Sequence, residues 1–248
     1  DEYEPVARKL AAVIGIEYCG PTTFEASRLM YWPSCSKDSE YVFQFEDKPF
    51  ASADGILAQY DDWRDMTAWP QVPGAAPRAK VLLARQSDPT KKEGLIGAFC
   101  RVYDIRGALL KYLPNAYEDV DGKADRMTYT GGTTTAGAVL YEDGKFLYSH
   151  HATDPCCDQL VNAFDLVRIH LFHELDVDIK PHTGGNARPS FKAMRKLAME
   201  DEVVLRELNL EKSHQTMSVF TDLKNEDNQV KTEDNQLEIR EKPTETVL

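Results

Sequence analysis

The stretch Ala138-Val-Leu-Tyr-Glu-Asp-Gly-Lys-Phe-Leu-Tyr-Ser149 gives the strongest folding signal in the chain. Apolar and aromatic runs lie on both sides of Asp143-Gly144, a dipeptide that accepts the positive φ angles of a tight hairpin turn. Branched and aromatic side chains fit the half-buried surface of a sheet, so we expect strands over 138–141 and 145–149. Met127-Thr-Tyr-Thr130 predicts a further strand, and the three strands indicate an antiparallel sheet.

Helical patterns surround this sheet. Asp104 and Asn162 are placed to cap helices that run to Leu113 and to about Leu175, because their side-chain oxygens accept N–H groups of the first turn. A further helix is expected over 190–208. Helices packed on an antiparallel sheet predict a compact α+β module. The residues expected to face its core are Ile105, Leu109, Leu110, Leu113, Phe164, Val167, Leu171, Leu175, Phe191, Met194, Leu197 and Leu205.

The N-terminal part has shorter signals. Apolar residues at helical spacing predict an amphipathic helix from Tyr3 to Ile14, with Gly15 as its stop. A second helix is expected from Ser52, a suitable cap, to Asp65. The segment 69–77 has three prolines in nine residues and no periodicity, which is typical of a linker.

The segment Phe24–Asp38 concentrates an arginine, two large aromatic residues, a proline and small polar residues. In an extended conformation Arg28 and Trp32 share one face. Arg28 is then suited to hold a phosphate while an aromatic ring stacks on a base. The alternative is a half-buried strand over 29–32 that ends at Pro33, and pattern alone favours this alternative.

The strand over 29–32 has a natural partner in the alternating run Tyr41–Phe45. A polar turn at 37–39 separates the two. We therefore expect a hairpin here, which would complete a sheet begun upstream.

Two blocks of sequence resemble phage and prophage replication proteins of the archaeo-eukaryotic primase superfamily, which often carry a virulence-associated E helicase. The first block resembles the end of their primase-polymerase domain and consists of Thr22–Phe24, Arg28–Ser34 and Lys37–Phe43. The second block resembles the segment that follows the polymerase and consists of Gly97–Tyr103, Tyr148–Pro155 and Asn162–His170. The resemblance covers roughly residues 1–205 and implies a nucleotide or DNA site at Arg28, Tyr31, Trp32, Ser34 and Lys37.

The resemblance also implies what this chain lacks. The family's polymerases hold two divalent ions, magnesium or manganese, with an Asp-x-Asp-like motif and a later carboxylate, because phosphoryl transfer needs charge neutralised at the attacking and leaving oxygens. The first motif is expected before residue 1, and Cys19-Gly-Pro21 occupies the place of the later carboxylate. We expect the C-terminal part of such a protein, truncated at both ends, with no catalytic residues, metal or cofactor of its own. Although the parent family is a nucleotidyltransferase, we do not expect this chain to polymerise alone.

The net charge of the chain argues against a strong, indiscriminate nucleic-acid binder. The formal net charge is −12, and residues 201–248 hold twelve acidic and six basic residues, which is half of that excess. Clustered Lys and Arg supply most of the affinity for phosphate backbones. Arg188, Lys192 and Arg195 would share one face of a helix, with Lys196 beside them. A solvated helix face is the favoured interpretation and a DNA-facing stripe at Lys192 and Arg195 is the alternative.

Histidine, cysteine and aspartate are dense between residues 150 and 173. Zinc needs four converging ligands, and neighbouring residues on a strand point in opposite directions, so a structural role is favoured. We expect Asp154 or a histidine to hydrogen-bond loop backbone near Asn162. Asp165 and Arg168 are expected to form a helix-surface pair. The glycine- and threonine-rich loop 131–137 lacks the ending of a phosphate-binding Walker loop.

Several further sequence features limit the class of protein to which this chain can belong. Five irregularly spaced cysteines indicate free thiols and a cytoplasmic location. No apolar run approaches the roughly 20 residues that span a bilayer. The repeat in 224–230 and 231–237 has one apolar residue in seven, too few for a coiled coil, so a disordered acidic tail is expected.

The expected fold class is α+β. It combines a remnant of a primase-polymerase sheet with flanking helices (1–68), a linker (69–78), a second small helix-rich α+β module (79–209) and the acidic tail (210–248).

Two functions follow from these observations. The first is a phage or prophage replication accessory that binds single-stranded or primed DNA, or docks on replication proteins, without a polymerase metal site. The second is an acidic phage-derived interaction protein that sequesters or inhibits a host nucleic-acid-binding factor, with carboxylates imitating phosphates.

Overall fold

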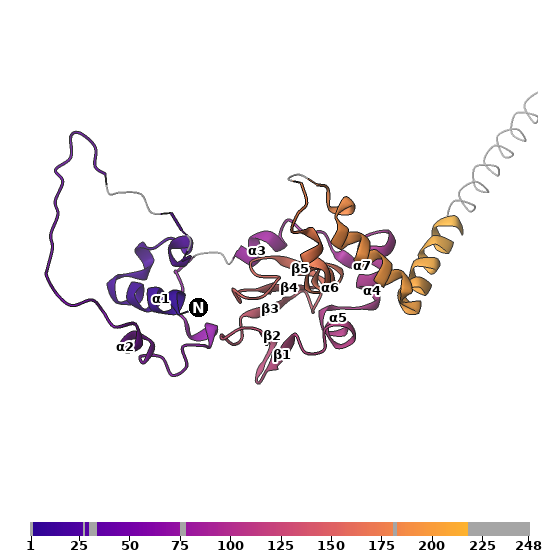
Figure 1. Cartoon of the computed structure of the whole chain (residues 1–248), viewed down its shortest axis with the longest axis horizontal. Coiled ribbons are helices and arrows are strands. Elements are labelled where there is room, and N and C mark those ends of the chain that lie inside the picture. The colour runs from indigo at the N-terminus through magenta and orange to yellow at the C-terminus, as the bar shows by residue number, and fades with distance from the viewer. Residues whose placement is uncertain (1, 27, 30–33, 75–77, 181–182, 218–248) are drawn as a thin grey trace, which may run out of the picture.

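The computed structural model describes residues 2–26, 28–29, 34–74, 78–180 and 183–217. The structure is mixed α+β, with helices gathered around a five-stranded antiparallel sheet (Figure 1). The expected fold class is therefore confirmed. The expected acidic tail falls largely on residues 218–248, outside the described part.

The sheet is a meander in which every strand pairs with its neighbour in sequence. Its strands are β1 (Tyr117–Val120), β2 (Lys123–Tyr129), β3 (Ala138–Tyr141), β4 (Phe146–Ser149) and β5 (Leu160–Asn162). The predicted hairpin is confirmed, because β3 and β4 pair from Ala138 opposite Ser149 to Tyr141 opposite Phe146. Glu142, Asp143 and Gly144 all have positive φ angles (49°, 54° and 83°), the backbone that a tight turn requires.

Four helices pack together beside this sheet. They are α4 (Gly94–Val102), α5 (Ile105–Tyr112), α6 (Ala163–Phe172) and α7 (Pro189–Glu200). Of these, α6 contacts α4, α5, α7 and β5 and forms the centre of the layer. Phe99 of α4 meets Phe164 of α6 edge to face, with ring centroids 5.7 Å apart, in a core that also buries Leu147 and Met194.

Both predicted helix caps are confirmed. The Asp104 carboxylate accepts the N–H of Gly107 at 2.7 Å, and the Asn162 amide oxygen accepts the N–H of Asp165 at 3.0 Å. Some predicted core residues are wrong, since Leu110 is 80% exposed and Leu171 and Leu175 are also exposed. Ala108 and Leu109 of α5 are buried, and Leu110 lies about 100° further around the helix, on the solvent side. The α6 helix ends at Phe172, which takes Leu175 off its face.

The helix expected over 190–208 is divided at Asp201. The α7 helix stops at Glu200, and a new helix occupies residues 202–217. Asp201 is extended, and its carboxylate accepts the N–H of Val203 at 3.0 Å, as a cap does.

The N-terminal part begins with α1 (Tyr3–Ile14), which has the predicted bounds. Gly15 ends it with a φ of 117°, a left-handed conformation that glycine adopts without strain. The buried residues of α1 are Pro5 and Ala11, whereas Val13 and Ile14 are both 77% exposed. The helix expected over 52–65 is shorter, since α2 (Ala53–Leu57) starts at the Ser52 cap and ends after five residues.

The remaining helical elements are short. They are α3 (Arg78–Leu83) and the 3-10 turns η1 (Ile16–Tyr18), η2 (Pro21–Phe24), η3 (Met66–Ala68), η4 (Pro89–Lys91), η5 (His173–Asp176) and η6 (Gly185–Ala187). Within the described residues, no helix is both long enough and apolar enough to cross a membrane.

The hairpin expected near the N-terminus is not formed. The turn at 37–39 is present, but 41–45 is not a strand, and the described residues before Tyr117 contain none. A strand needs a hydrogen-bonded neighbour, and residues 34–51 instead form an exposed arm, seen at the left of Figure 1. The expected remnant of a polymerase sheet is thus absent from this part, while 30–33 lie outside the described residues.

The N-terminal part contacts the sheet through residues 64–67. Asp65 forms a parallel bridge with Thr135 and an ion pair with Lys123 at 3.0 Å. Trp69, placed in the expected linker, is buried and donates its indole N–H to the carbonyl of Trp63 at 2.7 Å. The segment that contacts the sheet is therefore closed on itself by a hydrogen bond between the residues on its two sides.

Candidate functional site

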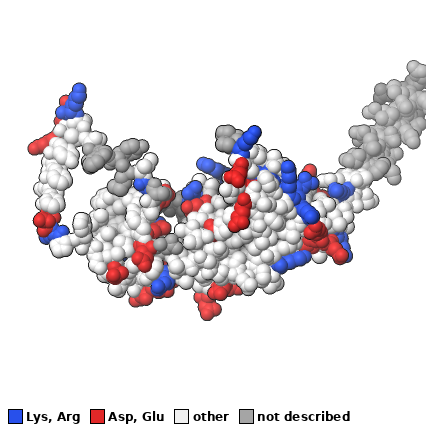
Figure 2. Space-filling model, in the orientation of Figure 1, with Lys and Arg blue, Asp and Glu red and all other residues white. Residues whose placement is uncertain are grey.

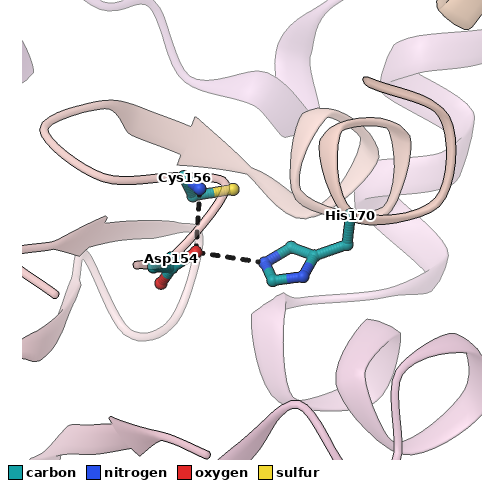
Figure 3. A group of neighbouring side chains, drawn as sticks. All are labelled: Asp154, Cys156 and His170. Atoms are coloured by element: carbon teal, nitrogen blue, oxygen red, sulfur yellow. Dashed lines mark hydrogen bonds and ion pairs between the residues drawn. The ribbon is translucent and has the colours of Figure 1, made fainter. Parts of the chain in front are cut away.

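A buried polar cluster lies in the loop between β4 and β5. The carboxylate of Asp154, fully buried, accepts the Tyr117 hydroxyl at 2.5 Å and the backbone N–H of Cys156 at 2.8 Å. The imidazole of His170 reaches it from α6, with Nε2 3.4 Å from Oδ1 (Figure 3). Asp154 thus hydrogen-bonds loop backbone, as expected from the sequence.

Hydrogen bonds assign the protons of this cluster. Tyr117 donates its hydroxyl hydrogen to Asp154, so its oxygen accepts from His170 Nε2, 3.1 Å away, which must carry a hydrogen. Burial acts to raise the pKa of Asp154, but hydrogen bonds from His170, Ser149, Tyr117 and the Cys156 backbone hold it below its usual value. The cluster therefore keeps a buried carboxylate charged by surrounding it with donors.

The Tyr117 hydroxyl and the Cys156 thiol, the other groups of this cluster that could lose a proton, stay protonated. Burial, followed by the nearby negative charge of Asp154, raises the pKa of the Tyr117 hydroxyl and of the Cys156 thiol. A nucleophilic cysteine is a thiolate in an accessible, electropositive place. Cys156 has the opposite surroundings, so its geometry fits packing and not covalent catalysis.

His151 forms a second buried bridge. Its Nε2 accepts the N–H of Tyr129 at 3.1 Å, so Nδ1 carries the hydrogen and donates it to Thr134, 2.9 Å away. Burial lowers the pKa of His151, which favours this neutral form. His151 thereby ties β2 to the loop 131–137.

Of the dense histidine, cysteine and aspartate residues, the structure brings together Asp154, Cys156 and His170. Their ligand atoms lie within 4.8 Å of one another. A zinc ion would need a fourth ligand and would have to displace the hydrogen bonds that Asp154 already accepts. We interpret the cluster as structural. His173 instead contacts the carbonyl of Ile169, and Asp158 accepts the hydroxyl of Tyr148.

A further polar cluster, which sequence reasoning missed, is centred on Asp201. Its Oδ2 accepts from Lys111 at 2.6 Å, from Tyr103 at 2.8 Å and from Tyr112. Burial opposes the charge of Asp201, but these donors, with Lys111 first, hold its pKa well below the usual range. The partners lie about 90 positions away in sequence, so no local pattern could reveal them.

The predicted basic residues of α7 are on the surface. Lys192 and Arg195 are exposed, while the opposite face buries Ser190, Met194 and Ala198. Among the described residues, neither Lys192 nor Arg195 has an ion-pair partner. Figure 2 shows Lys and Arg side chains gathered above the position of the α7 label of Figure 1.

The flanking basic residues of α7 are partly paired. Arg188 lies 3.9 Å from Asp176, and Lys196 lies 4.0 Å from Glu200. The same helix surface therefore has two unpaired and two weakly paired cations. We call Arg188, Lys192, Arg195 and Lys196 the α7 basic face.

The other predicted binding residues are elsewhere. Arg28, Ser34 and Lys37 are exposed on or beside the arm, at the opposite end of the molecule from α7 (Figure 1). Tyr31 and Trp32 lie outside the residues that the structure describes. The structure thus does not join the two predicted groups into one site. The structure confirms the predicted pair of Asp165 and Arg168, an ion pair in which Oδ1 and Nε lie 3.0 Å apart.

Comparison with known families gives one match, which falls on the N-terminal part. Residues 1–72 match the family model of the VapE N-terminal domain. No match was found among curated proteins or among solved structures. The match covers less than a third of the chain and supports a VapE-like phage or prophage protein.

Proposed function

We propose that this chain is a phage or prophage replication accessory that binds DNA through the α7 basic face. The observation that carries the proposal is the pair of exposed, unpaired cations Lys192 and Arg195 on a helix whose other face is locked in the core. A rigid helix that presents cations at helical spacing contacts successive phosphates at a low entropic cost.

The polymerase ancestry is part of the proposal. The N-terminal match to a VapE domain and the resemblance of Arg28–Ser34 to primase-polymerases support it. Gly20 stands just before η2, where the family places a metal-binding carboxylate, and it has no side-chain ligand. We therefore propose that the chain does not polymerise alone and takes no cofactor, and that the intact family uses magnesium or manganese. All five cysteines are free thiols, which supports a cytoplasmic location.

Charge reversal on the α7 basic face tests DNA binding. Lys192→Glu/Arg195→Glu should abolish binding of labelled single-stranded or primed DNA, measured by fluorescence anisotropy at 50 mM salt. The matched control Lys80→Glu/Arg85→Glu changes the net charge equally at exposed positions of α3 and just beyond it. The unchanged protein should lose affinity steeply as salt rises, by about tenfold or more between 50 and 200 mM, because binding releases counterions.

Two outcomes would contradict the proposal. One is the absence of DNA binding by the unchanged protein at low salt. The other is an equal loss of affinity in both double variants, which would mean that net charge and not the α7 basic face governs binding.

A second candidate function rests on a separate feature of the N-terminal part. A surface hollow of about 380 Å³ is lined by four acidic residues, Glu2, Asp54, Asp61 and Asp62, and by one basic residue, Arg64, which stacks on the ring of Trp63. Such a surface suits a basic partner, so we propose as the alternative an acidic protein that sequesters a host nucleic-acid-binding factor. A pull-down that recovers a basic host protein, and loses it on Asp61→Lys/Asp62→Lys, would favour this alternative.

A further inference from the structure

The arm of residues 34–51 exposes an unusual amount of aromatic surface. Tyr41, Phe43 and Phe45 are 57%, 72% and 73% exposed, and all described residues of the arm are exposed. Residues 40–48 have no regular secondary structure and form no ladder with another described segment. The Lys48 N–H is bonded locally to the Glu46 carbonyl at 3.0 Å. A run with so few internal backbone hydrogen bonds can become extended and act as a template for strand pairing.

The arm alternates with the period of a strand. In an extended chain Tyr41, Phe43 and Phe45 lie on one face. Glu40, Gln44 and Lys48 lie on the other face. This pattern predicts a strand with one aromatic side and one mainly polar side, which is stable only beside another strand.

The sheet of the same chain offers no suitable edge. Its two edge strands are β1 and β5. The β5 strand is three residues long and is contacted by α3. The β1 strand carries exposed Glu118, which would repel the acidic residues of the arm, and Asp119, which is already paired with Arg106. Neither edge of the described sheet therefore suits the arm, and a second copy of the chain supplies an alternative edge.

A second copy of the arm is a complementary edge in one register. If two arms pair antiparallel with Gln44 opposite Gln44, Glu40 of each copy lies opposite Lys48 of the other. Lys48 is paired with Glu46 of its own arm in the structure, so it would exchange this partner for Glu40 of the second copy. Phe43 then lies opposite Phe45, again twice by symmetry. Opposite charges and aromatic pairs at directly facing positions stabilise a sheet. A register centred on Phe43 instead sets Glu40 against Glu46, a pair of like charges.

We propose that two copies of this chain associate through an antiparallel ribbon of residues 40–48, with Gln44 on the two-fold axis. Each dimer brings together six aromatic side chains, which bury on the order of 150 Å² or more each. At about 150 Å² each, their sum of about 900 Å² lies below the roughly 1,200 Å² at which stable specific interfaces begin. The dimer is therefore weak and depends on protein concentration.

The first test uses sedimentation velocity of the full chain over a range of concentrations. The unchanged protein should pass from monomer to dimer, and Phe43→Asp/Phe45→Asp should remain monomeric. Val13→Asp/Ile14→Asp is the matched control, because these residues of α1 are equally exposed but lie outside the arm. A protein that stays monomeric throughout, or a dimer that survives the arm substitutions, would overturn the proposal.

Charge reversal tests the register itself. Glu40→Lys and Lys48→Glu should each weaken dimerisation by about fivefold, since each change sets two like-charged pairs against one another in the symmetric ribbon. The double variant Glu40→Lys/Lys48→Glu should recover the original dissociation constant. Additive losses in the double variant would exclude this register.

Cysteine cross-linking gives an independent readout of the two-fold axis. In a Cys35→Ser background, Gln44→Cys should form a disulfide-linked dimer on mild oxidation, because directly opposed Cα atoms in a ladder lie within disulfide range. Glu40→Cys should not link to itself but should link to Lys48→Cys when the two variants are mixed. Self-linking of Glu40→Cys as efficient as that of Gln44→Cys would refute the ribbon. A partner strand from a different protein would leave all three variants unlinked, which would also refute it.

Discussion

At the scale of single residues, two buried carboxylates hold the sheet and helices together. Asp154 joins β1, the loop before β5 and α6 through Tyr117, Cys156 and His170. Asp201 joins α4 and α5 to the helix of residues 202–217. If either carboxylate loses its charge, some of the buried donors around it lose their acceptor. The free-energy cost of a buried donor without a partner is larger than the net stability that one hydrogen bond contributes.

We predict that Asp154→Asn destabilises the protein by about 2–3 kcal/mol, because an amide cannot accept from all of the donors that face the carboxylate. Tyr117→Phe should cost about 1–2 kcal/mol, since it removes one donor and leaves the carboxylate otherwise bonded. Urea unfolding measures both changes. The control Asp125→Asn, at an exposed position of β2, should change the free energy of unfolding by less than about 0.5 kcal/mol.

Asp201 gives a prediction on pH. Its pKa is lower in the folded protein than the value of about 4 in an unfolded chain. The unfolded state therefore binds more protons below pH 4, and the stability that this carboxylate contributes is present above that pH and is lost as the pH falls toward the folded value.

Asp201→Asn should accordingly flatten the dependence of unfolding free energy on pH between about 4 and 2. It should also lower stability at pH 7, because it breaks the pair with Lys111. Unfolding curves at a series of pH values measure the slope. If the unfolding free energy of this variant falls with pH below 4 as steeply as that of the unchanged protein, the lowered pKa of Asp201 does not contribute to acid unfolding.

At the scale of elements, the sequence predicts the ends of helices and strands where a nearby residue determines them. Gly15, Asp104, Asn162 and the turn at Asp143-Gly144 each fix an element end through a cap or a positive φ angle, and all four are where they were expected. At the break, Asp201 caps the next helix locally through the N–H of Val203 and is held from far away in sequence by Lys111 and Tyr112. Helical periodicity alone predicted one continuous helix because it takes account of neither interaction.

The candidate site also separates into residues that local spacing predicts and residues that contacts distant in sequence bring together. Helical spacing was enough to place Lys192 and Arg195 on one exposed face. The cluster of Tyr117, Asp154 and His170 comes from β1, a loop and α6, and no spacing in the sequence unites these residues.

The α4 helix, which the sequence pattern missed, depends on a close backbone approach. A Cβ atom at Gly97 would lie 1.6 Å from the carbonyl oxygen of Lys92, a distance that no small adjustment relieves. We predict that Gly97→Ala destabilises the protein by about 2–3 kcal/mol. Gly184→Ala is the matched control, because nothing lies within 4 Å of its added Cβ, and thermal unfolding should show no loss of stability in this variant.

At the scale of the whole molecule, the two proposed surfaces lie at opposite ends. The aromatic arm extends from the N-terminal part, and the α7 basic face lies on the far side of the sheet (Figure 1). A dimer joined through its arms would therefore carry its two basic faces outward. Substitutions at one surface should leave the other unaffected, so Phe43→Asp/Phe45→Asp should still bind DNA as a monomer.

The meander order of the strands has a consequence for how the chain acquires its structure. Each strand from β1 to β5 finds its partner a short distance along the chain, so closing these loops costs little entropy. Low contact order favours rapid folding. During synthesis, the sheet can assemble as soon as Asn162 has left the ribosome, before α6, which packs on β5, and α7, which packs on α6, have been made.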